Sequence, residues 1–352
     1  MMARPPEEDI TEQSDGSAAI RAAWDAFEAG NLETARRRAE RLGEESPEGL
    51  FLRAACDIEE DDVPGGIALL ERAIAADPEW ASPELAFAEL LAETPEKLSE
   101  ARKHAARAVE LADEEDEYLS AVALKAGLEA EAGDAKQARR TLAELPPPEV
   151  ALGDPVAALE IADLHLALGD AELARGRLRT LTGSEEGVES AEAWHALGCA
   201  AADLGDEVEM RAAWKRSWAL DTAPGAARDE QRRFTDAEVA AIAEQALEEL
   251  PDRARELLRD VPIVIAEQPA ESDVDAGVDP RSLGLFSGTA YPDGSHLGGQ
   301  PGLTQILIFR RNLERLAAGD DELREEIRTT LLHETGHFFG LDDEELEGLG
   351  LS

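Results

Sequence analysis

The sequence contains little cysteine, and the cysteines that it has are not arranged for cross-linking. Its two cysteines, Cys56 and Cys199, lie far apart and form no Cys-x-x-Cys pair. Disulfide-stabilised secreted folds need several closely spaced cysteines, so this class is excluded. Both residues lie in helix-forming segments, which favours buried, reduced thiols and a cytoplasmic location.

Positive charge and long apolar runs are also scarce. There are 34 Lys and Arg against 78 Asp and Glu, which gives a formal net charge of -44. Such an acidic surface repels phosphate backbones and anionic lipids, so nucleic acid and membranes are not expected as partners. No apolar run approaches the roughly 18 residues of a membrane span. The acidic segment 1–17 lacks the apolar core of a signal peptide and is expected to be a disordered tail.

From 18 to 224 the chain is rich in Ala and Leu, and its helical periodicity is interrupted at regular intervals. Glycine followed by Asn or Asp marks four turns, at Gly30, Gly133, Gly169 and Gly205. The last three of these glycines are 36 residues apart. A period of this length is typical of a solenoid of stacked helix pairs, because one pair alone cannot bury its apolar face.

The last unit of this array resembles a tetratricopeptide repeat. Its large and small packing residues match that repeat at Trp194, Leu197, Gly198, Gly205, Trp214 and Leu220. The resemblance implies an all-α solenoid with a concave groove that binds a peptide or a partner protein. The sequence predicts about six repeats, at 18–45, 47–79, 83–113, 116–147, 154–184 and 188–223. The single histidines on these helices, His104, His165 and His195, are expected to be packing or surface residues.

A second domain is expected over 234–352, after a polar linker at 225–233. Its first helix is marked by a capping box, in which Thr235 and Glu238 can each accept the other's backbone N–H. Three β-forming runs follow, at 262–265, 283–288 and 304–309. A helix at 310–317 and a long C-terminal helix complete a small α+β domain.

A metal-binding motif, H-E-x-x-H-x-x-G-x-x-D, lies in the C-terminal helix. His333 and His337 are one helical turn apart on the same face and can bind one metal ion. Glu334, about 100° around the helix, can reach a water molecule at that ion. Catalytic zinc uses three protein ligands and an open position for water. The pattern therefore predicts a hydrolytic site with one Zn²⁺ ion.

The third ligand is expected from the acidic tail that follows the motif histidines, unless another part of the domain supplies it. Gly340 can end the helix in the left-handed conformation and turn the chain back. The carboxylates that could then reach the metal are Asp342, Asp343, Glu344, Glu345 and Glu347.

The motif and the residues around it resemble the minimal zincins, a family of compact zincin-like metallopeptidases of the HExxHxxGxxD type. No methionine follows the motif, so the methionine turn of the metzincins is absent. By this resemblance, His333, His337 and Asp343 are the zinc ligands and Glu334 is the general base. Asp342 is the alternative third ligand.

Three further residues of the second domain are candidates for supporting roles. Tyr291 and His296 are polar residues of a glycine-rich loop, and either could stabilise the oxyanion or contact the substrate. Gly336, between the two motif histidines, would let the sheet or another backbone segment approach the helix closely.

Together these features predict a multidomain cytoplasmic zinc metallopeptidase. Zinc-activated water would hydrolyse a peptide bond, and the repeats would bind the substrate or a partner protein. The alternative is a tetratricopeptide interaction scaffold whose zincin-like domain binds zinc but is inactive. An open zinc position in a groove beside a strand edge would favour the peptidase, whereas a closed four-ligand site would favour the scaffold.

Overall fold

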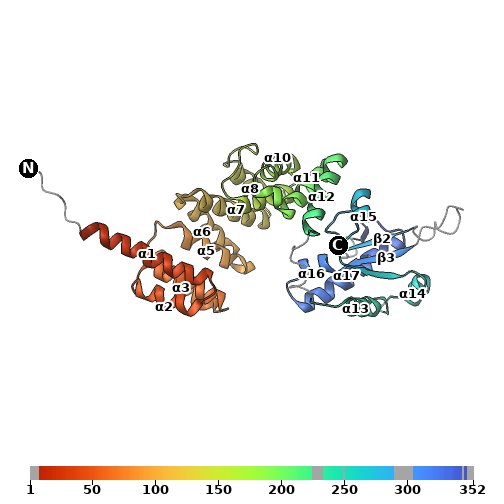
Figure 1. Cartoon of the computed structure of the whole chain (residues 1–352), viewed down its shortest axis with the longest axis horizontal. Coiled ribbons are helices and arrows are strands. Elements are labelled where there is room, and N and C mark those ends of the chain that lie inside the picture. The colour runs from red at the N-terminus through yellow and green to blue at the C-terminus, as the bar shows by residue number, and fades with distance from the viewer. Residues whose placement is uncertain (1–7, 224–232, 249, 289–303, 343–344, 347–352) are drawn as a thin grey trace, which may run out of the picture. The chain divides into compact units, whose positions relative to one another are not determined.

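The computed structural model describes residues 8–223, 233–248, 250–288, 304–342 and 345–346. Contacts divide the chain into two compact units, Met1–Leu181 and Thr182–Ser352. The first is helical, and the second contains the last helix pair together with a small α+β domain (Figure 1). None of the helices in the described ranges is long and apolar enough to cross a membrane.

Up to residue 223, the described part of the chain forms six helix pairs, joined in places by short 3₁₀ turns. The pairs are α1 (Glu8–Glu28) with α2 (Leu32–Arg41), α3 (Pro47–Glu59) with α4 (Val63–Ala76), α5 (Ala81–Ala92) with α6 (Leu98–Leu111), α7 (Glu115–Glu131) with α8 (Ala135–Leu142), α9 (Pro155–Ala167) with α10 (Ala171–Thr182), and α11 (Ala191–Asp203) with α12 (Glu207–Asp221). The predicted class, a helical repeat solenoid followed by a small α+β domain, is confirmed.

The turns within the pairs have the conformation that their sequence predicts. The four turn glycines have φ angles between 70° and 78°, a left-handed region that glycine enters without strain. In three of these pairs the next residue, Asn31, Asp134 or Asp206, then caps the second helix. In the last pair, for example, the carboxylate of Asp206 accepts the backbone N–H of Glu209 at 3.1 Å.

The last helix pair also packs as the tetratricopeptide pattern predicts. A Cβ atom at Gly198 would lie 2.1 Å from Cδ1 of Trp214, so only glycine lets this indole ring cross α11. Trp214 and Leu197 are buried. The small residue on one helix thus makes room for the large residue on the other.

Helix α1 begins earlier than the sequence suggests. A disordered tail was expected over 1–17, but residues 8–17 already belong to this helix. No proline occurs between Glu8 and Glu28, so a helix that starts there continues into the Ala-rich residues beyond 17. Residues 1–7 lie outside the described part of the chain.

The α+β domain contains a sheet and five helices among its described residues. The helices are α13 (Asp236–Glu248), α14 (Asp252–Leu258), α15 (Glu271–Ala276), α16 (Arg310–Leu316) and α17 (Asp320–Phe338), and the strands are β1 (Ile263–Ala266), β2 (Gly284–Ser287) and β3 (Gln305–Phe309). The strand order is β1-β3-β2, with β1 parallel and β2 antiparallel to β3. All three predicted strands are present. Helix α15 was not predicted.

The core of this domain lies between the sheet and two helices. Helix α17 contacts β2, β3 and α13, and α13 contacts β1. Ile306 and Ile308 on β3 are buried in one cluster with Ile327 and Leu331 on α17. The predicted capping box starts α13, since Glu238 accepts the N–H of Thr235 at 2.8 Å. This packing fixes the metal-motif helix against the edge strand β2.

Candidate metal centre

Helix α17 brings the two motif histidines together. The Nε2 atoms of His333 and His337 lie 3.0 Å apart, and both side chains are half-buried. Two nitrogens bound to one tetrahedral zinc at about 2.0–2.1 Å would be about 3.3 Å apart. The two imidazoles therefore converge as zinc ligands would, and their chemistry fits that metal.

A backbone carbonyl sets the orientation of the second histidine. Nδ1 of His337 lies 3.0 Å from the carbonyl oxygen of Leu341. A carbonyl can only accept, so Nδ1 carries the proton and the lone pair of Nε2 is directed at the shared position. A metal-binding histidine commonly has such a partner.

The turn after α17 supplies this carbonyl. Gly340 has a φ of 83°, as its place in the motif predicts. The N–H of Gly340 donates to the carbonyl of His337 at 3.0 Å, and that of Leu341 donates to the carbonyl of Gly336 at 3.1 Å. These two bonds form a Schellman motif, which turns the chain back along the helix.

The side chain of Glu334, on α17, lies against the edge strand β2. Its side chain is 7% exposed, and its Oε2 accepts the backbone N–H of Phe286, on β2, at 2.5 Å. The carboxylate is therefore held at the face of α17 that also carries His333. In the described sheet β2 is an edge strand, and its amide at Phe286 points away from β3 toward the helix.

The close approach of sheet and helix depends on a glycine that the sequence analysis did not single out. A Cβ atom at Gly284 would lie 2.8 Å from both Cγ of Glu334 and Cγ2 of Thr330. Gly336 also allows the close approach expected of it, but of the chain that follows the helix, because a Cβ there would lie 2.3 Å from Cδ2 of Leu346. It makes room for the returning chain, whereas Gly284 makes room for the sheet.

A cavity of about 230 Å³ opens beside His333 and Glu334. The rest of its wall comes from α17 and from the start of β2, at Ser282, Leu283, Gly284, Glu326, Thr329 and Thr330. The buried Asn312 holds this wall in place, since its Nδ2 donates to the carbonyls of Pro280 at 2.9 Å and Ser282 at 2.7 Å. The arrangement leaves space for a ligand beside the motif and next to a strand edge.

Three of the predicted site residues lie outside the described residues, namely Asp343, Tyr291 and His296. Asp342 is described and exposed. Its Oδ1 accepts the backbone N–H of Glu345 at 2.9 Å, and its own N–H donates to the Glu345 carboxylate at 3.1 Å. Asp342 therefore caps the turn that follows the helix.

A second group of possible ligands was not predicted. His195, Cys199 and Asp279 have ligand atoms that all lie within 4.8 Å of one another. Burial lowers the pKa of His195, but hydrogen bonds and negative charge from Asp279 and Cys199 outweigh it and raise this pKa to about 9. The only signal in the sequence was a His and a Cys one helical turn apart, and the partner Asp279 is distant along the chain.

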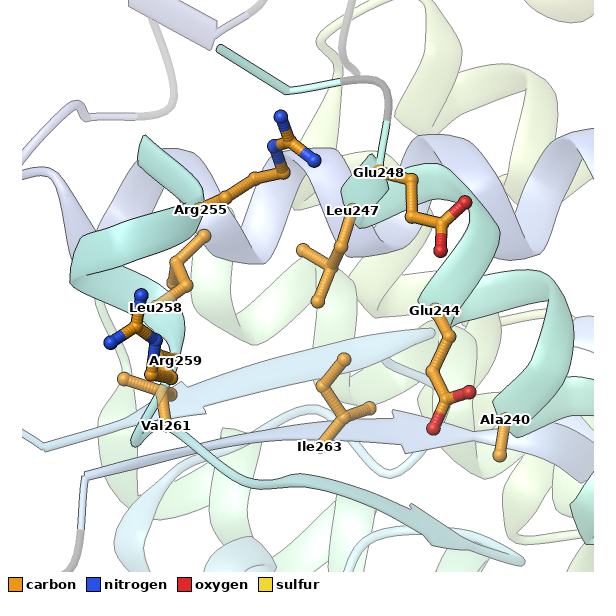
Figure 2. Close-up of a pocket in the computed structure, with 9 residues that line it drawn as sticks. All are labelled: Ala240, Glu244, Leu247, Glu248, Arg255, Leu258, Arg259, Val261 and Ile263. Atoms are coloured by element: carbon orange, nitrogen blue, oxygen red, sulfur yellow. The ribbon is translucent and has the colours of Figure 1, made fainter. Parts of the chain in front are cut away.

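Another cavity, of about 310 Å³, lies away from the motif between α13, α14 and β1. Figure 2 shows Glu244 and Glu248 on the α13 side, with Arg255 and Arg259 on the other, while Ile263 lies between them. None of the predicted site residues lines it.

Comparison with known families supports the predicted resemblance of the C-terminal domain to zincin-like metallopeptidases. Residues 258–351 match the model of a family described as zincin-like metallopeptidase. The match includes the motif, the cavity wall and all three strands. Among curated proteins, none matches the chain.

Several solved structures resemble the chain, and some of them are described as TPR proteins. PilF of Pseudomonas aeruginosa is 17% identical, with a TM-score of 0.47 over 60% of this chain and 94% of its own. A TPR protein of Thermus thermophilus is 16% identical, with a TM-score of 0.40 over 54% and 98%. The pilus biogenesis factor PilW is 16% identical, with a TM-score of 0.45 over 61% and 96%. These values are low, so the repeat architecture rests on the chain's own helix pairs and turns.

Proposed function

We propose that the C-terminal domain is a zinc-dependent metallopeptidase. The observation that carries this proposal is the convergence of His333 and His337 beside the buried carboxylate of Glu334 and an open cavity. The family match over 258–351 supports the same activity. One zinc ion bound at the histidines supplies Lewis acidity, which polarises a carbonyl and lowers the pKa of a water molecule.

Asp343 is proposed as the third ligand. The chain on both sides of it runs along α17, because Leu341 contacts His337 and Leu346 packs against Gly336. Asp342 is the weaker candidate, since its carboxylate already caps the next turn.

Glu334 is proposed as the general base. It takes a proton from the attacking water and passes it to the leaving amine, a role in which a positioned carboxylate contributes about 10²–10⁴-fold. The hydrogen bond from Phe286 orients it, and the cavity at its side is where a peptide bond can enter. Tyr291 and His296 are proposed as donors to the oxyanion.

The repeats are proposed to bind a basic segment of the substrate or of a partner protein. Two adjoining hollows of about 540 and 530 Å³ share Glu89 and Ser120 in their walls. Eight acidic residues line them, and no Lys or Arg is among the described residues of their walls. Phe51 and Trp80 border the second hollow, where they can contact the stem or the charged end of a Lys or Arg.

Electrostatic crowding in the hollows supports a cationic partner. Burial raises the pKa of Glu89, and the nearby charge of Glu160 raises it further. Burial and the charge of Asp154 do the same for Glu160. A Lys or Arg placed among these groups relieves their repulsion, and a tethered binding site also raises the local concentration of a substrate.

The proposed location is the cytoplasm. Cys56 and Cys199 are both free, and a reducing compartment keeps such thiols reduced.

The test measures metal content and peptide-library cleavage on the same purified full-length protein. We expect the wild type to cleave peptides with zinc bound at the motif. Glu334→Gln should keep that zinc and lose activity by about 10²–10⁴-fold, whereas His337→Ala should lose both. Equal inactivity of the wild type and Glu334→Gln with zinc bound would refute the peptidase and favour the interaction scaffold.

A further inference from the structure

Outside the motif, three side chains of different chemistry meet where α11 faces the segment before β2. His195 and Cys199 lie one turn apart on α11, and Asp279 comes from that segment. We propose that these three residues form a second metal-binding site, one that takes zinc and joins the last helix pair to the α+β domain. This inference goes beyond the proposed peptidase activity and does not depend on it.

The distances are close to those of a tetrahedral zinc site. Sγ of Cys199 lies 3.7 Å from Nε2 of His195, and a thiolate and an imidazole on one zinc would be about 3.6 Å apart. Sγ also lies 3.8 Å from Nδ1, so the thiol stands beside the ring and must rotate toward the Nε2 side to share an ion with it. Nε2 of His195 lies 2.8 Å from Oδ1 of Asp279, compared with about 3.3 Å for two such ligands. Rotation of the Cys199 and Asp279 side chains about their own bonds would admit the ion.

The donor set selects the class of metal. A thiolate with an imidazole favours zinc over magnesium or calcium, which bind oxygen ligands. Half-burial of the three side chains shields the site while leaving access from solvent, and water can take the fourth position. The histidine motif on α17 contains no sulfur, so the two sites differ in chemistry.

The position of the group explains what a metal would do there. Asp279 also accepts the N–H of Arg281 at 2.7 Å, and Asn312 holds the carbonyls of Pro280 and Ser282. This segment leads directly into β2, whose amide at Phe286 holds the proposed catalytic carboxylate. A metal on α11 and Asp279 would therefore steady the segment that leads to the proposed active site.

The competing interpretation is an ion pair. Without a metal, a protonated His195 donates to Asp279, and the Cys199 thiol is only a second contact of the same ring. Binding a metal would displace the proton from the imidazole and from the thiol, so metal affinity would rise with pH.

Cobalt substitution separates the two interpretations. The metal-free full-length protein is titrated with Co²⁺, and its absorption is recorded, because cobalt bound to a thiolate has an intense near-ultraviolet charge-transfer band. Imidazole and carboxylate ligands do not give this band. We expect the band in the wild type, its loss in Cys199→Ser, and its retention in Cys56→Ser. Cys56 is a suitable control, since it is fully buried and burial raises the pKa of its thiol.

Zinc content and two further variants complete the test. We expect Cys199→Ser to bind one zinc fewer than the wild type. A His333→Ala, His337→Ala double variant should keep the cobalt band, which separates this site from the proposed peptidase. Asp279→Asn keeps the thiol and should weaken cobalt binding at least tenfold. This variant replaces Cys199→Ser in the test if Cys199→Ser does not fold. A wild type with no charge-transfer band, or a band that survives in Cys199→Ser, would overturn the proposal.

Discussion

At the scale of single residues, Gly284 sets the distance between α17 and the sheet, because it has no side chain. A methyl group at Gly284 would press on Glu334 and on Thr330. We expect Gly284→Ala to displace the carboxylate and to lower kcat/KM by up to about 10²-fold, because a shift of about 1 Å in a catalytic group can cost that much. Zinc content should change little, since the atoms nearest to the added methyl group belong to Glu334 and Thr330 and not to the histidines.

Steady-state kinetics and metal analysis on the same sample check this prediction. Gly319→Ala is the matched control, because a Cβ there meets no heavy atom within 4 Å. Full activity in Gly284→Ala would show that the contact between β2 and Glu334 does not limit the reaction.

A buried carboxylate ties the start of the domain to α16. Oε2 of Glu314 lies 2.7 Å from Nη1 of Arg310, and its Oε1 accepts the N–H groups of Arg233 at 3.1 Å and Phe234 at 3.2 Å. Glu314→Ala would take the buried carboxylate away from the buried Arg310 guanidinium, whose other carboxylates, Asp236 and Glu267, are exposed, and would leave two amides without their side-chain acceptor. We expect a loss of about 3–5 kcal/mol in the free energy of unfolding.

Hydrogen exchange of the α13 and α16 amides would measure this loss, because it reports on the domain within the full chain. The control is Glu325→Ala on α17, which removes an exposed ion pair with Arg328 and should cost about 1 kcal/mol or less. Similar costs for the two variants would contradict the role assigned to Glu314.

At the scale of elements, the turn after α17 links the end of the helix to the proposed metal site. Gly340 is in a left-handed conformation, which costs a non-glycine residue about 1–2 kcal/mol. Gly340→Ala should therefore destabilise the turn and move the Leu341 carbonyl away from His337. We expect weaker zinc binding, by about tenfold, in a competition titration against a chelator.

Gly205→Ala provides a control with the same backbone strain. Gly205 has a φ of 70° in the turn between α11 and α12, and a Cβ there meets no heavy atom within 4 Å. Gly205→Ala should lower the free energy of unfolding about as much as Gly340→Ala does, and it should leave the zinc affinity of the motif unchanged. If both variants weakened zinc equally, a general loss of stability would explain the effect.

Elements with local signals were predictable from the sequence, and features that depend on long-range contacts were not. Neighbouring residues determine the Gly-Asn and Gly-Asp turns, the capping box at Thr235 and the strands. Their sequence patterns were therefore sufficient to predict them. Helix α15 has only six residues in a stretch rich in Asp and Pro, and local propensity favoured a loop. The role of Gly284 and the meeting of Cys199 with Asp279 depend on packing between segments far apart in the chain.

At the scale of the whole molecule, acidic charge gathers in the hollows of the repeats. We expect a Lys- and Arg-rich peptide to bind the full-length protein, and an acidic peptide of equal length not to bind. Because the pKa values of Glu89 and Glu160 are raised, these groups take up protons at a higher pH than ordinary glutamates. Affinity should therefore fall as the pH decreases from about 7 to about 5, and it should fall with added salt.

Titration calorimetry over this pH range measures the effect. A Glu89→Gln, Glu160→Gln double variant should bind on the order of tenfold more weakly. Glu172→Gln, which removes an exposed charge on α10 outside both hollows, should leave binding nearly unchanged. Binding that is insensitive to salt and to the double variant would place the peptide elsewhere.

The boundary between the two compact units falls at a different point in the chain from the change in fold. The fold changes near 234, but the contacts place α11 and α12 in the second unit, Thr182–Ser352. Nε1 of Trp218 donates to the carbonyl of Pro269 at 2.9 Å, and Asp221 pairs with Arg315 at 2.8 Å. The last helix pair thus supports the α+β domain through a half-buried hydrogen bond and an ion pair.

Two fragments would test whether that support is needed. A fragment of residues 183–352 keeps these contacts, whereas a fragment of residues 234–352 removes them and exposes the surface around Pro269. We expect the longer fragment to unfold cooperatively with zinc bound, and the shorter one to melt at least about 5 °C lower. Scanning calorimetry with metal analysis measures both. Equal melting temperatures and zinc contents would show that the α+β domain is complete without the last helix pair, and that α11 and α12 serve the solenoid alone.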